Sequence, residues 1–333
     1  MIWNNVELFN VAEIETCANG GIYMRKFPTS VMHAFDGTKN TYAPVVSRMT
    51  TACEIRFVGK GADITLSSDA NGTVEIYRGD FLCRVEWLPA NEVKTIALRD
   101  DAALDKYAPN LCGRFSSDVW RVVFDHDFCG VLHEFKPLDT VRPPLQTEVP
   151  KAKILAYGSS ITHSAGAVLY TNSYIYTVGK TLGADVLCKG MGGSCHIEKE
   201  VADYLFEENW DFAVLELGIN MVTVYPVEVF EQRAEYLIKK LLTKGKPILL
   251  ISNYTSFHNL PKDEHHAANA DYVRCLESIY QRLKTENLYY IRGQEIVTEW
   301  EYLTADLLHP SPYGHGEMGR KIAKKIREEL KIL

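Results

Sequence analysis

Apolar and polar residues alternate along the first part of the chain, between Cys53 and about Phe135. The alternation comes in short runs such as CEIRFV, ADITLSS and WRVVFDH, separated by turn signals such as Asn71-Gly72. A strand with one face in a core and the other in solvent has this two-residue period. The pattern predicts an antiparallel β-sandwich.

The pattern changes after Pro150. Short, nearly continuous apolar runs now alternate with longer amphipathic segments, which is typical of parallel strands buried on both faces by helices. The predicted strands are 153–157, 184–188, 211–217, 247–252 and, with a weaker pattern, 288–291. The sequence therefore predicts an α/β domain with a parallel sheet, whose ligands bind beyond the carboxyl ends of the strands.

Helical stripes lie between and after these strands. One stripe ends near Gly245, a suitable residue for a helix C-terminus. It consists of Phe230, Ala234, Leu237, Ile238, Leu241 and Leu242, and the last segment of the chain has a similar stripe at Met318, Ile322, Ala323, Ile326 and Leu330.

The chain is long enough for two domains. Its 333 residues exceed the usual size of one hydrophobic core. The stretch VRPPLQTEVP, at 141–150, has three prolines and no periodicity, which favours an extended connector. We therefore expect a sandwich domain at 1–140, a linker at 141–150 and the α/β domain at 151–333.

Composition and charge limit the partners and the compartment that we expect for this protein. The net charge is −7 with dispersed lysines and arginines, so nucleic acid is not expected as a partner. No apolar run approaches the roughly 20 residues of a membrane span, and the acidic, amide-rich N-terminus does not resemble a secretory signal, so we expect a cytoplasmic protein without membrane contact. The eight cysteines form no CxxC pair, and we expect reduced, packed thiols.

Two polar loops follow the first two predicted strands. Gly158-Ser159-Ser160 can present a serine hydroxyl at the sheet edge, although a serine there can equally cap the next helix. The stretch KGMGGSCH, 189–196, has glycines whose bare N–H groups suit an anion, or it is simply a flexible loop.

Two further segments carry side chains that can act together with this serine and this glycine loop. Asn220, in LGINM, can donate an amide N–H to an oxyanion or brace a turn. In DLLHP, Asp306 can orient one nitrogen of His309 and leave the other free to accept a hydroxyl proton, or both residues can be ordinary loop polarity. Together the segments supply a nucleophile, oxyanion donors and a base at one sheet edge, which is the set that acyl transfer requires.

With these four segments the chain from about residue 151 resembles the SGNH family, also called GDSL esterases and lipases. The resemblance implies a flavodoxin-like three-layer domain behind a jelly-roll-like sandwich. It makes Ser160 the nucleophile, His309 the base and Asp306 its orienter. Gly193 and Asn220 join the Ser160 N–H in an oxyanion hole, with Gly192 as the alternative glycine. No metal or cofactor is expected.

Two residues depart from the family pattern. Ser159 stands where Gly-Asp-Ser has Asp, and Met221 follows Asn220 where many members have Asp. Both changes affect the hydrogen bonds that support the site. The stretches YGSSIT and NM are similar to a bacterial branch in which a β-sandwich precedes the hydrolase and several members remove acetyl groups from sugars.

The function expected from this resemblance is hydrolysis of short acyl esters, acetyl esters on a carbohydrate in particular. The substrate is then a small ester or an oligosaccharide. His163, His196 and His258 lie in loops near the expected site and are candidates to line it, whereas His265 and His266 are expected on a solvated surface. The alternatives are a lysophospholipase or thioesterase of the same fold, and an inactive carbohydrate-binding protein. The sequence leaves the oligomeric state open.

Overall fold

The computed structural model describes residues 1–18, 20–99, 102–107 and 113–330. The chain forms two compact units. The first consists of Met1–Met32 and Val45–Lys151, and the second of His33–Pro44 and Ala152–Leu333. Residues 33–44, which the sequence assigns to the sandwich domain, thus belong to the unit that contains the parallel sheet.

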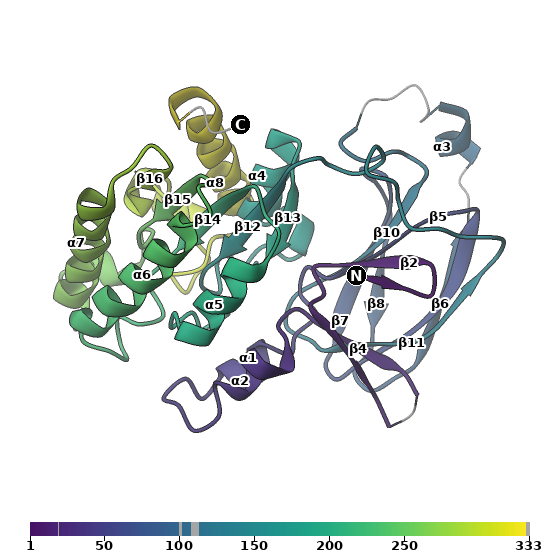
Figure 1. The fold of residues 1–333 in the computed structure, drawn as a ribbon, viewed down its shortest axis with the longest axis horizontal. Helices are drawn as coiled ribbons and strands as arrows, with labels where there is room; N and C mark the ends of the chain where they lie inside the picture. Colours follow the sequence, from purple (N-terminus) through teal and green to yellow (C-terminus); the bar gives the residue numbers. More distant parts are fainter. Residues whose placement is uncertain (19, 100–101, 108–112, 331–333) are drawn as a thin grey trace. The chain divides into compact units, whose positions relative to one another are not determined.

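The first unit is a sandwich of two antiparallel sheets, as predicted (Figure 1). One sheet has the strand order β1 (Ile2–Trp3), β2 (Val6–Phe9), β5 (Glu54–Val58), β10 (Val119–Phe124), β7 (Gly72–Arg78) and β8 (Phe81–Leu88). The other has the order β3 (Glu13–Thr16), β4 (Ile22–Arg25), β11 (Gly130–Pro137), β6 (Gly61–Ser68) and β9 (Lys94–Arg99). A short helix, α3, spans Ala102–Tyr107.

Alternation places the apolar residues of both sheets in one core. Val122 pairs with Ile55 on one side and with Ile76 on the other, and all three side chains are buried. The same core contains side chains from β1 to β4, such as Leu8 and Met24, so the sandwich includes short strands before Cys53 that the sequence pattern did not mark.

The proline-rich stretch at 141–150 is fastened to the sandwich. Arg142 forms an antiparallel bridge with Val58, and the Ser116 N–H donates to the Glu148 carbonyl at 2.9 Å. The Arg142 guanidinium also binds the Glu148 carboxylate at 2.7 Å. The stretch bends in a turn at 146–148, where the Glu148 N–H donates to the Leu145 carbonyl at 2.9 Å, and it belongs to the sandwich unit.

The second unit contains a five-stranded parallel sheet, which confirms the α/β prediction. Its strand order is β13 (Asp185–Cys188), β12 (Lys153–Tyr157), β14 (Phe212–Glu216), β15 (Ile248–Ile251) and β16 (Leu288–Ile291). From β12 the chain moves to β13 on one side and then to β14 on the other, so the loops after β12 and β14 diverge and open the crevice where ligands of such sheets bind.

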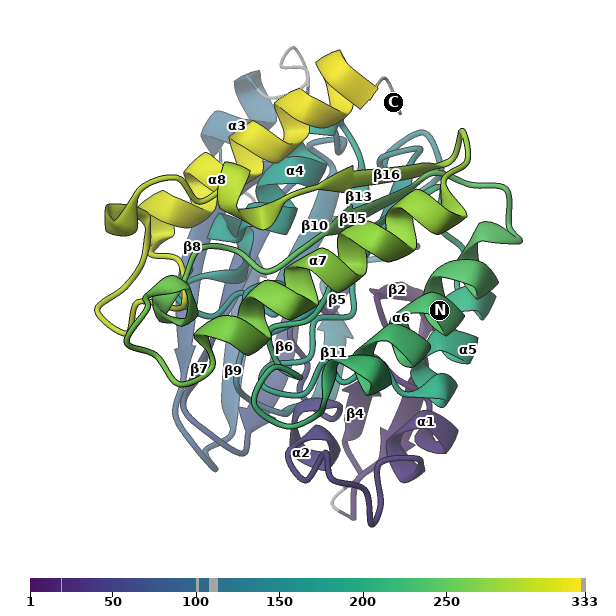
Figure 2. The same cartoon turned by 90° about the vertical axis from the view of Figure 1, so that its left-hand side faces the viewer.

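Helices cover both faces of this sheet. Figure 2 shows α5 (Lys199–Glu207), α6 (Val227–Leu242) and α7 (His266–Leu283) side by side along one face. The helices α4 (Tyr174–Leu182) and α8 (Pro312–Lys324) pack against each other, and α8 continues as a π-helical stretch, Lys325–Leu330. In α6 the predicted stripe is buried from Phe230 to Leu241, with Leu242 partly exposed. Among the described helices, none combines the length and apolarity of a membrane span.

Short helical turns complete both units. They are α1 (Thr29–His33), α2 (Ala43–Val46), and the 3-10 turns η2 (Tyr170–Asn172), η3 (Phe257–Asn259), η4 (Gly293–Glu295) and η5 (Trp300–Tyr302). Asn40, between α1 and α2, donates hydrogen bonds to the Ser194 carbonyl at 3.0 Å and to the Glu198 carboxylate at 2.7 Å. These bonds hold residues 33–44 beside the loop after β13.

Candidate active site

A chain of hydrogen bonds joins a serine, a histidine and an aspartate from distant parts of the sequence. Ser160 Oγ lies 2.7 Å from His309 Nε2, and His309 Nδ1 lies 2.7 Å from Asp306 Oδ2. An ionised carboxylate only accepts hydrogen bonds, so Nδ1 carries the proton and Nε2 accepts from the serine hydroxyl. This is the arrangement in which imidazole can act as a general base toward a hydroxyl.

The aspartate is held by its own loop. Asp306 Oδ1 accepts hydrogen bonds from the N–H groups of Leu308 and His309, both at 2.9 Å, and from Thr304 Oγ1 at 2.7 Å. Leu307, which lies between Asp306 and Leu308, has a φ of 55°, so the short turn bends through the left-handed region. Burial raises the pKa of Asp306, but the hydrogen bond with the His309 imidazole, together with these three, outweighs it and holds that pKa below its usual range. Asp306 is therefore ionised at neutral pH.

The two adjacent serines have different surroundings. Ser160 Oγ faces the imidazole, whereas Ser159 is 1% exposed and its hydroxyl donates to Glu216 Oε2 at 2.7 Å. Gly158 precedes them because a Cβ there would lie 2.3 Å from Thr162 Oγ1 and 2.6 Å from Glu216 Oε2. Of the two hydroxyls, only that of Ser160 is placed to react with an external ester.

The nucleophile turn and the histidine loop meet closely. A Cβ at Gly166 would lie 2.1 Å from the Pro310 carbonyl, so only glycine fits there, and its φ of 87° also favours glycine. His315, in α8, binds the Ala165 carbonyl through Nε2 at 2.9 Å and accepts from the Tyr174 N–H through Nδ1 at 3.1 Å. These contacts fix the turn relative to the helix that follows His309.

The amide of Asn220 is bound to the protein on one side. Its Oδ1 accepts from the Cys195 N–H at 3.1 Å, which leaves Nδ2 as the group free to donate to a ligand. The N–H groups of Ser160 and Gly193 donate to no acceptor within the described part of the chain. Gly192 also approaches the nucleophile, since a Cβ there would lie 3.8 Å from Ser160 Cβ. The geometry is compatible with either glycine, and the roles of Gly193, Gly192 and Asn220 stay predictions.

Met221 packs in the core. It is fully buried, and its carbonyl accepts from the Tyr272 hydroxyl at 3.0 Å. The position after Asn220 therefore supports the loop through its backbone and through apolar packing.

The three histidines predicted to line the site are buried, between 2% and 5% exposed. His163 lies against Gly192, with Nδ1 3.1 Å from the position of a Cβ there. The ring of His196 packs edge-on against Tyr225, and burial followed by the charge of Arg233 lowers the pKa of His196 to about 4, so it is neutral. Their contact with substrate stays a prediction.

One group of side chains in the described structure has the residue types and spacing of a metal site. The ligand atoms of His258, Asp263 and His265 lie within 4.8 Å of one another. His258 Nδ1 already contacts Asp263 Oδ2 at 2.7 Å, and the same oxygen accepts from the His265 N–H at 3.0 Å. Asp263 thus has partners within the protein, and no step of the chemistry below depends on this group.

Cys195 lies beside the glycine loop and is 2% exposed. Burial raises the pKa of its thiol well above the usual value, so the thiolate is not formed at neutral pH. It is a packed thiol, as the sequence predicts.

Sequence reasoning missed two residues at this site. Tyr42 lies beside the glycine loop: its Cδ1 is 3.6 Å from the position of a Cβ at Gly193, and the residue is 51% exposed. Glu216, at the end of β14, contacts the nucleophile turn. Tyr42 carries no local signal of this contact because about 150 residues separate it from Gly193, while Glu216 was visible as the one charged residue inside the final apolar run of its strand.

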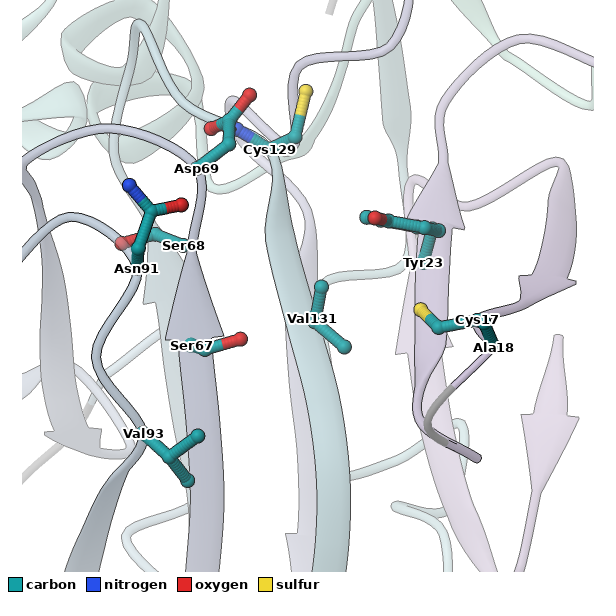
Figure 3. A pocket seen from close by; sticks show the side chains of 10 residues that line it. All are labelled: Cys17, Ala18, Tyr23, Ser67, Ser68, Asp69, Asn91, Val93, Cys129 and Val131. Atoms are coloured by element: carbon teal, nitrogen blue, oxygen red, sulfur yellow. The ribbon is translucent and has the colours of Figure 1, made fainter.

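A separate cavity lies in the sandwich. Its volume is about 380 Å³, and its lining includes Tyr23, Ser67, Asp69, Asn91 and Cys129 (Figure 3). Figure 3 shows Ser67 and Val131 on neighbouring strands, with Tyr23 on the strand beyond Val131. An aromatic ring beside hydroxyl, amide and carboxyl groups can bind a small polar ligand.

The parallel sheet with the Ser160–His309–Asp306 chain at its edge defines an α/β enzyme of the carboxylic ester hydrolase class. Residues 151–327 match the model of the GDSL-like Lipase/Acylhydrolase family. That match covers more than half of the chain, so the protein belongs to this family. No curated protein matches the sequence.

Solved structures share the fold of the whole chain. A salicylyl-acyltransferase, SsfX3, from a tetracycline biosynthetic pathway has 14% identity and a TM-score of 0.79, covering 99% of this chain and 96% of its own. A family two carbohydrate esterase from Cellvibrio japonicus has 13% identity and a TM-score of 0.65, with coverage of 98% and 96%. An acetyl xylan esterase, Est2A, from the rumen bacterium Butyrivibrio proteoclasticus has 12% identity and a TM-score of 0.56, with coverage of 85% and 91%.

Proposed function

We propose that the protein is a serine esterase that removes short acyl groups, acetyl groups in particular, from a carbohydrate. The observation that carries the proposal is the 2.7 Å contact between Ser160 Oγ and His309 Nε2, with Asp306 behind the imidazole. The family of the chain hydrolyses acyl esters, which supports the reaction type.

The reaction proceeds in two steps. Ser160 Oγ attacks the acyl carbon while His309 Nε2 takes its proton, and the oxyanion rests on the N–H groups of Ser160 and Gly193 and on the Asn220 amide. His309 then returns the proton to the departing sugar oxygen, leaving an acyl-serine. In the second step His309 takes a proton from water, the hydroxide attacks the acyl group, and the carboxylic acid leaves as the Ser160 oxygen recovers the proton.

Two features support a carbohydrate as the alcohol part. The side chains of His309 and Asp306 are 25% and 49% exposed, so a bulky leaving group can remain outside the protein during the reaction. Tyr42 offers an exposed ring beside the glycine loop, and aromatic rings provide large apolar faces at low entropic cost. Similarity in fold to a carbohydrate esterase and to an acetyl xylan esterase points the same way.

The test is acetate release from acetylated xylo-oligosaccharides, measured for the wild type and two neighbouring variants. Ser160→Ala should leave almost no activity, a loss on the order of 10⁶ in kcat. Ser159→Ala is the matched control and should keep activity within about tenfold, because it removes a hydrogen bond that supports the turn and leaves the nucleophile in place. Full activity in Ser160→Ala would contradict the proposal.

A chain-length series of esters separates the alternative enzymes. A deacetylase should lose activity sharply as the acyl chain becomes longer. A lysophospholipase or long-chain thioesterase should become more active over the same series. The sandwich cavity supports the carbohydrate-binding alternative, because its lining offers an aromatic ring and polar groups. Glycan binding that Tyr23→Ala abolishes, with no ester hydrolysed by the wild type, would favour that alternative.

Acyl transfer to an alcohol is a second candidate, favoured by the match of the entire chain to an acyltransferase fold. The acyl-serine would then react with an alcohol in place of water. Adding a sugar acceptor to the assay decides between the two, because a transferase forms a new ester faster than it releases acetate.

A further inference from the structure

Glu216 is a buried carboxylate directly behind the nucleophile turn. It ends β14 and is 1% exposed. Its Oε2 accepts hydrogen bonds from the Ser159 N–H and the Ser159 hydroxyl, both at 2.7 Å, and from Thr162 Oγ1 at 3.2 Å. Its Oε1 has no hydrogen-bond partner in the part of the chain that the structure describes.

No described cation pairs with this carboxylate. Burying an unpaired carboxylate costs free energy, and an apolar side chain would fill the same space more favourably. Burial raises the pKa of Glu216 to about 7, against the opposing effect of hydrogen bonds from Ser159 and Thr162. Packing alone therefore does not account for a glutamate here.

The hydrogen bonds fix the amides on both sides of the nucleophile. Glu216 holds the Ser159 N–H, and the Ser159 hydroxyl that it also holds accepts from the Ile161 N–H at 3.2 Å. The N–H of Ser160, between them, donates to no acceptor within the described chain. The turn thus has a fixed backbone around Ser160 and an unoccupied N–H at Ser160 itself, which is what an oxyanion donor needs.

We propose that Glu216 is the positioning residue of the nucleophile turn: its carboxylate, supplied by the neighbouring strand, takes over the support that Asp gives in Gly-Asp-Ser sequences, where this chain has Ser159. This inference rests on the proposed role of Ser160. Glu216 acts through Ser159 and Thr162 and does not touch the substrate.

An exchange of the carboxylate between the two positions tests the proposal. Glu216→Ala removes the support, and Ser159→Asp places a second carboxylate against the first, where like charges in a buried site repel. In the double variant, Ser159→Asp with Glu216→Ala, one carboxylate returns to the turn, within reach of the Ile161 N–H and the Thr162 hydroxyl. If the carboxylate acts on the turn, each of the two substitutions should restore the activity that the other removes. A carboxylate with another role would not produce this recovery.

The readout is the rate at which a fluorophosphonate probe modifies Ser160 in the full chain, followed by peptide mass spectrometry, beside kcat and KM for an activated acetate ester. Glu216→Ala and Ser159→Asp should each slow both rates by about 10- to 100-fold with little change in KM. The double variant should be at least about tenfold faster than either single one.

Glu216→Gln keeps an acceptor oxygen of the same shape and should lose less activity than Glu216→Ala. Asp185→Asn, a buried carboxyl at the opposite end of the sheet, is the control and should react as the wild type does.

Three results would overturn the proposal. They are wild-type rates in Glu216→Ala, equal rates in Glu216→Gln and Glu216→Ala, and a double variant no faster than the slower single one. If the wild type neither reacts with the probe nor hydrolyses any ester, the proposed function fails as well, and this outcome differs from the other three because wild-type reactivity itself is missing.

Discussion

Two buried glutamates, Glu54 in the sandwich and Glu216 in the unit with the parallel sheet, have opposite electrostatic surroundings. Glu54, in the sandwich, accepts hydrogen bonds from Arg121 and Arg56, at 2.8 Å in each case. Burial raises the pKa of Glu54, but the two guanidinium groups outweigh it and hold that pKa well below the usual range. Glu216 is equally buried and is held by a backbone N–H and two hydroxyls.

The difference separates a structural carboxylate from one placed for chemistry. The charge of Glu54 is balanced within the core, where Arg56 and Arg121 also stack on Phe9 and Phe115. Glu216 has no cation beside it among the described residues, and its donors belong to the loop that carries Ser160. Substitutions at Glu54 should therefore affect folding, and substitutions around Glu216 should affect rate.

Apart from Ser160→Ala, the largest effect should come from Glu54→Gln. It removes the carboxylate that both buried guanidinium groups bind, and the Glu7 carboxylate lies farther from Arg56, at 3.8 Å. This loss should lower the free energy of unfolding by about 3–5 kcal/mol. Chemical denaturation followed by fluorescence measures this. Glu86→Gln, which breaks a partly exposed pair with Arg84 and Lys94, is the control and should cost at most about 1 kcal/mol. A loss of kcat in correctly folded Glu54→Gln would contradict the assignment of Glu54 to folding alone.

Asn220→Ala should have the next largest effect, on the rate alone. Losing one oxyanion donor should lower kcat by about 10² to 10³, with KM and the unfolding free energy nearly unchanged. Steady-state kinetics with an activated acetate ester tests this. Asn287→Ala, at the amino end of the sheet, should behave as the wild type, and an unchanged kcat in Asn220→Ala would remove Asn220 from the oxyanion hole.

The pH dependence of stability should have opposite signs at the two glutamates. Glu216 keeps its proton in the folded state up to about pH 7 but releases it near 4.5 when unfolded. Between these values the folded state binds more protons, so the free energy of unfolding falls as pH rises, by roughly 3 kcal/mol. Glu54 has a lowered pKa, so the stability it contributes is present above about 4.5 and is lost as pH falls below that value.

Denaturation of the wild type and of Glu216→Gln between about pH 4.5 and 7 separates the contribution of Glu216 to the free energy of unfolding from that of other titrating groups such as His196. The neighbours Tyr174, Tyr254, Cys188 and Cys195 add no charge there, because phenols and thiols are protonated below pH 7 and burial raises the pKa of Tyr174, Tyr254 and Cys195 further. The decline with pH should be smaller in the variant. Parallel curves would mean that Glu216 is ionised throughout.

Tyr42→Ala should have the smallest effect, on substrate binding. We expect KM for an acetylated oligosaccharide to rise about tenfold, which corresponds to about 1.4 kcal/mol, with no change for a small aryl acetate. Tyr107→Ala, an exposed tyrosine of α3 in the sandwich, is the control. An equal change for both substrates would remove Tyr42 from the sugar site.

The sequence was most informative where local pattern and burial agree. Strands such as 153–157 are buried on both faces, so an apolar run marks them directly. Asp306 and His309 lie three residues apart before a proline, so their contact is local and its geometry follows from the turn.

Contacts that depend on distant segments were not predictable. Val6 and Met24 lie in strands too short to show a clear period, and their burial is decided by the opposite sheet. Tyr42 lies beside the glycine loop in a segment whose Asn40 binds Ser194 and Glu198, more than 150 residues away. Glu216 belongs to an apolar strand, and whether a carboxylate is tolerated there depends on three donors supplied by a different loop.

The most direct test of the central claim is peptide mass spectrometry after rapid quenching of the enzyme with an acetylated oligosaccharide. The account predicts a transient acetyl group on Ser160, absent in Ser160→Ala and unaffected by Ser159→Ala in its position. An acetyl group on another residue, or acetate release by Ser160→Ala at the wild-type rate, would contradict it.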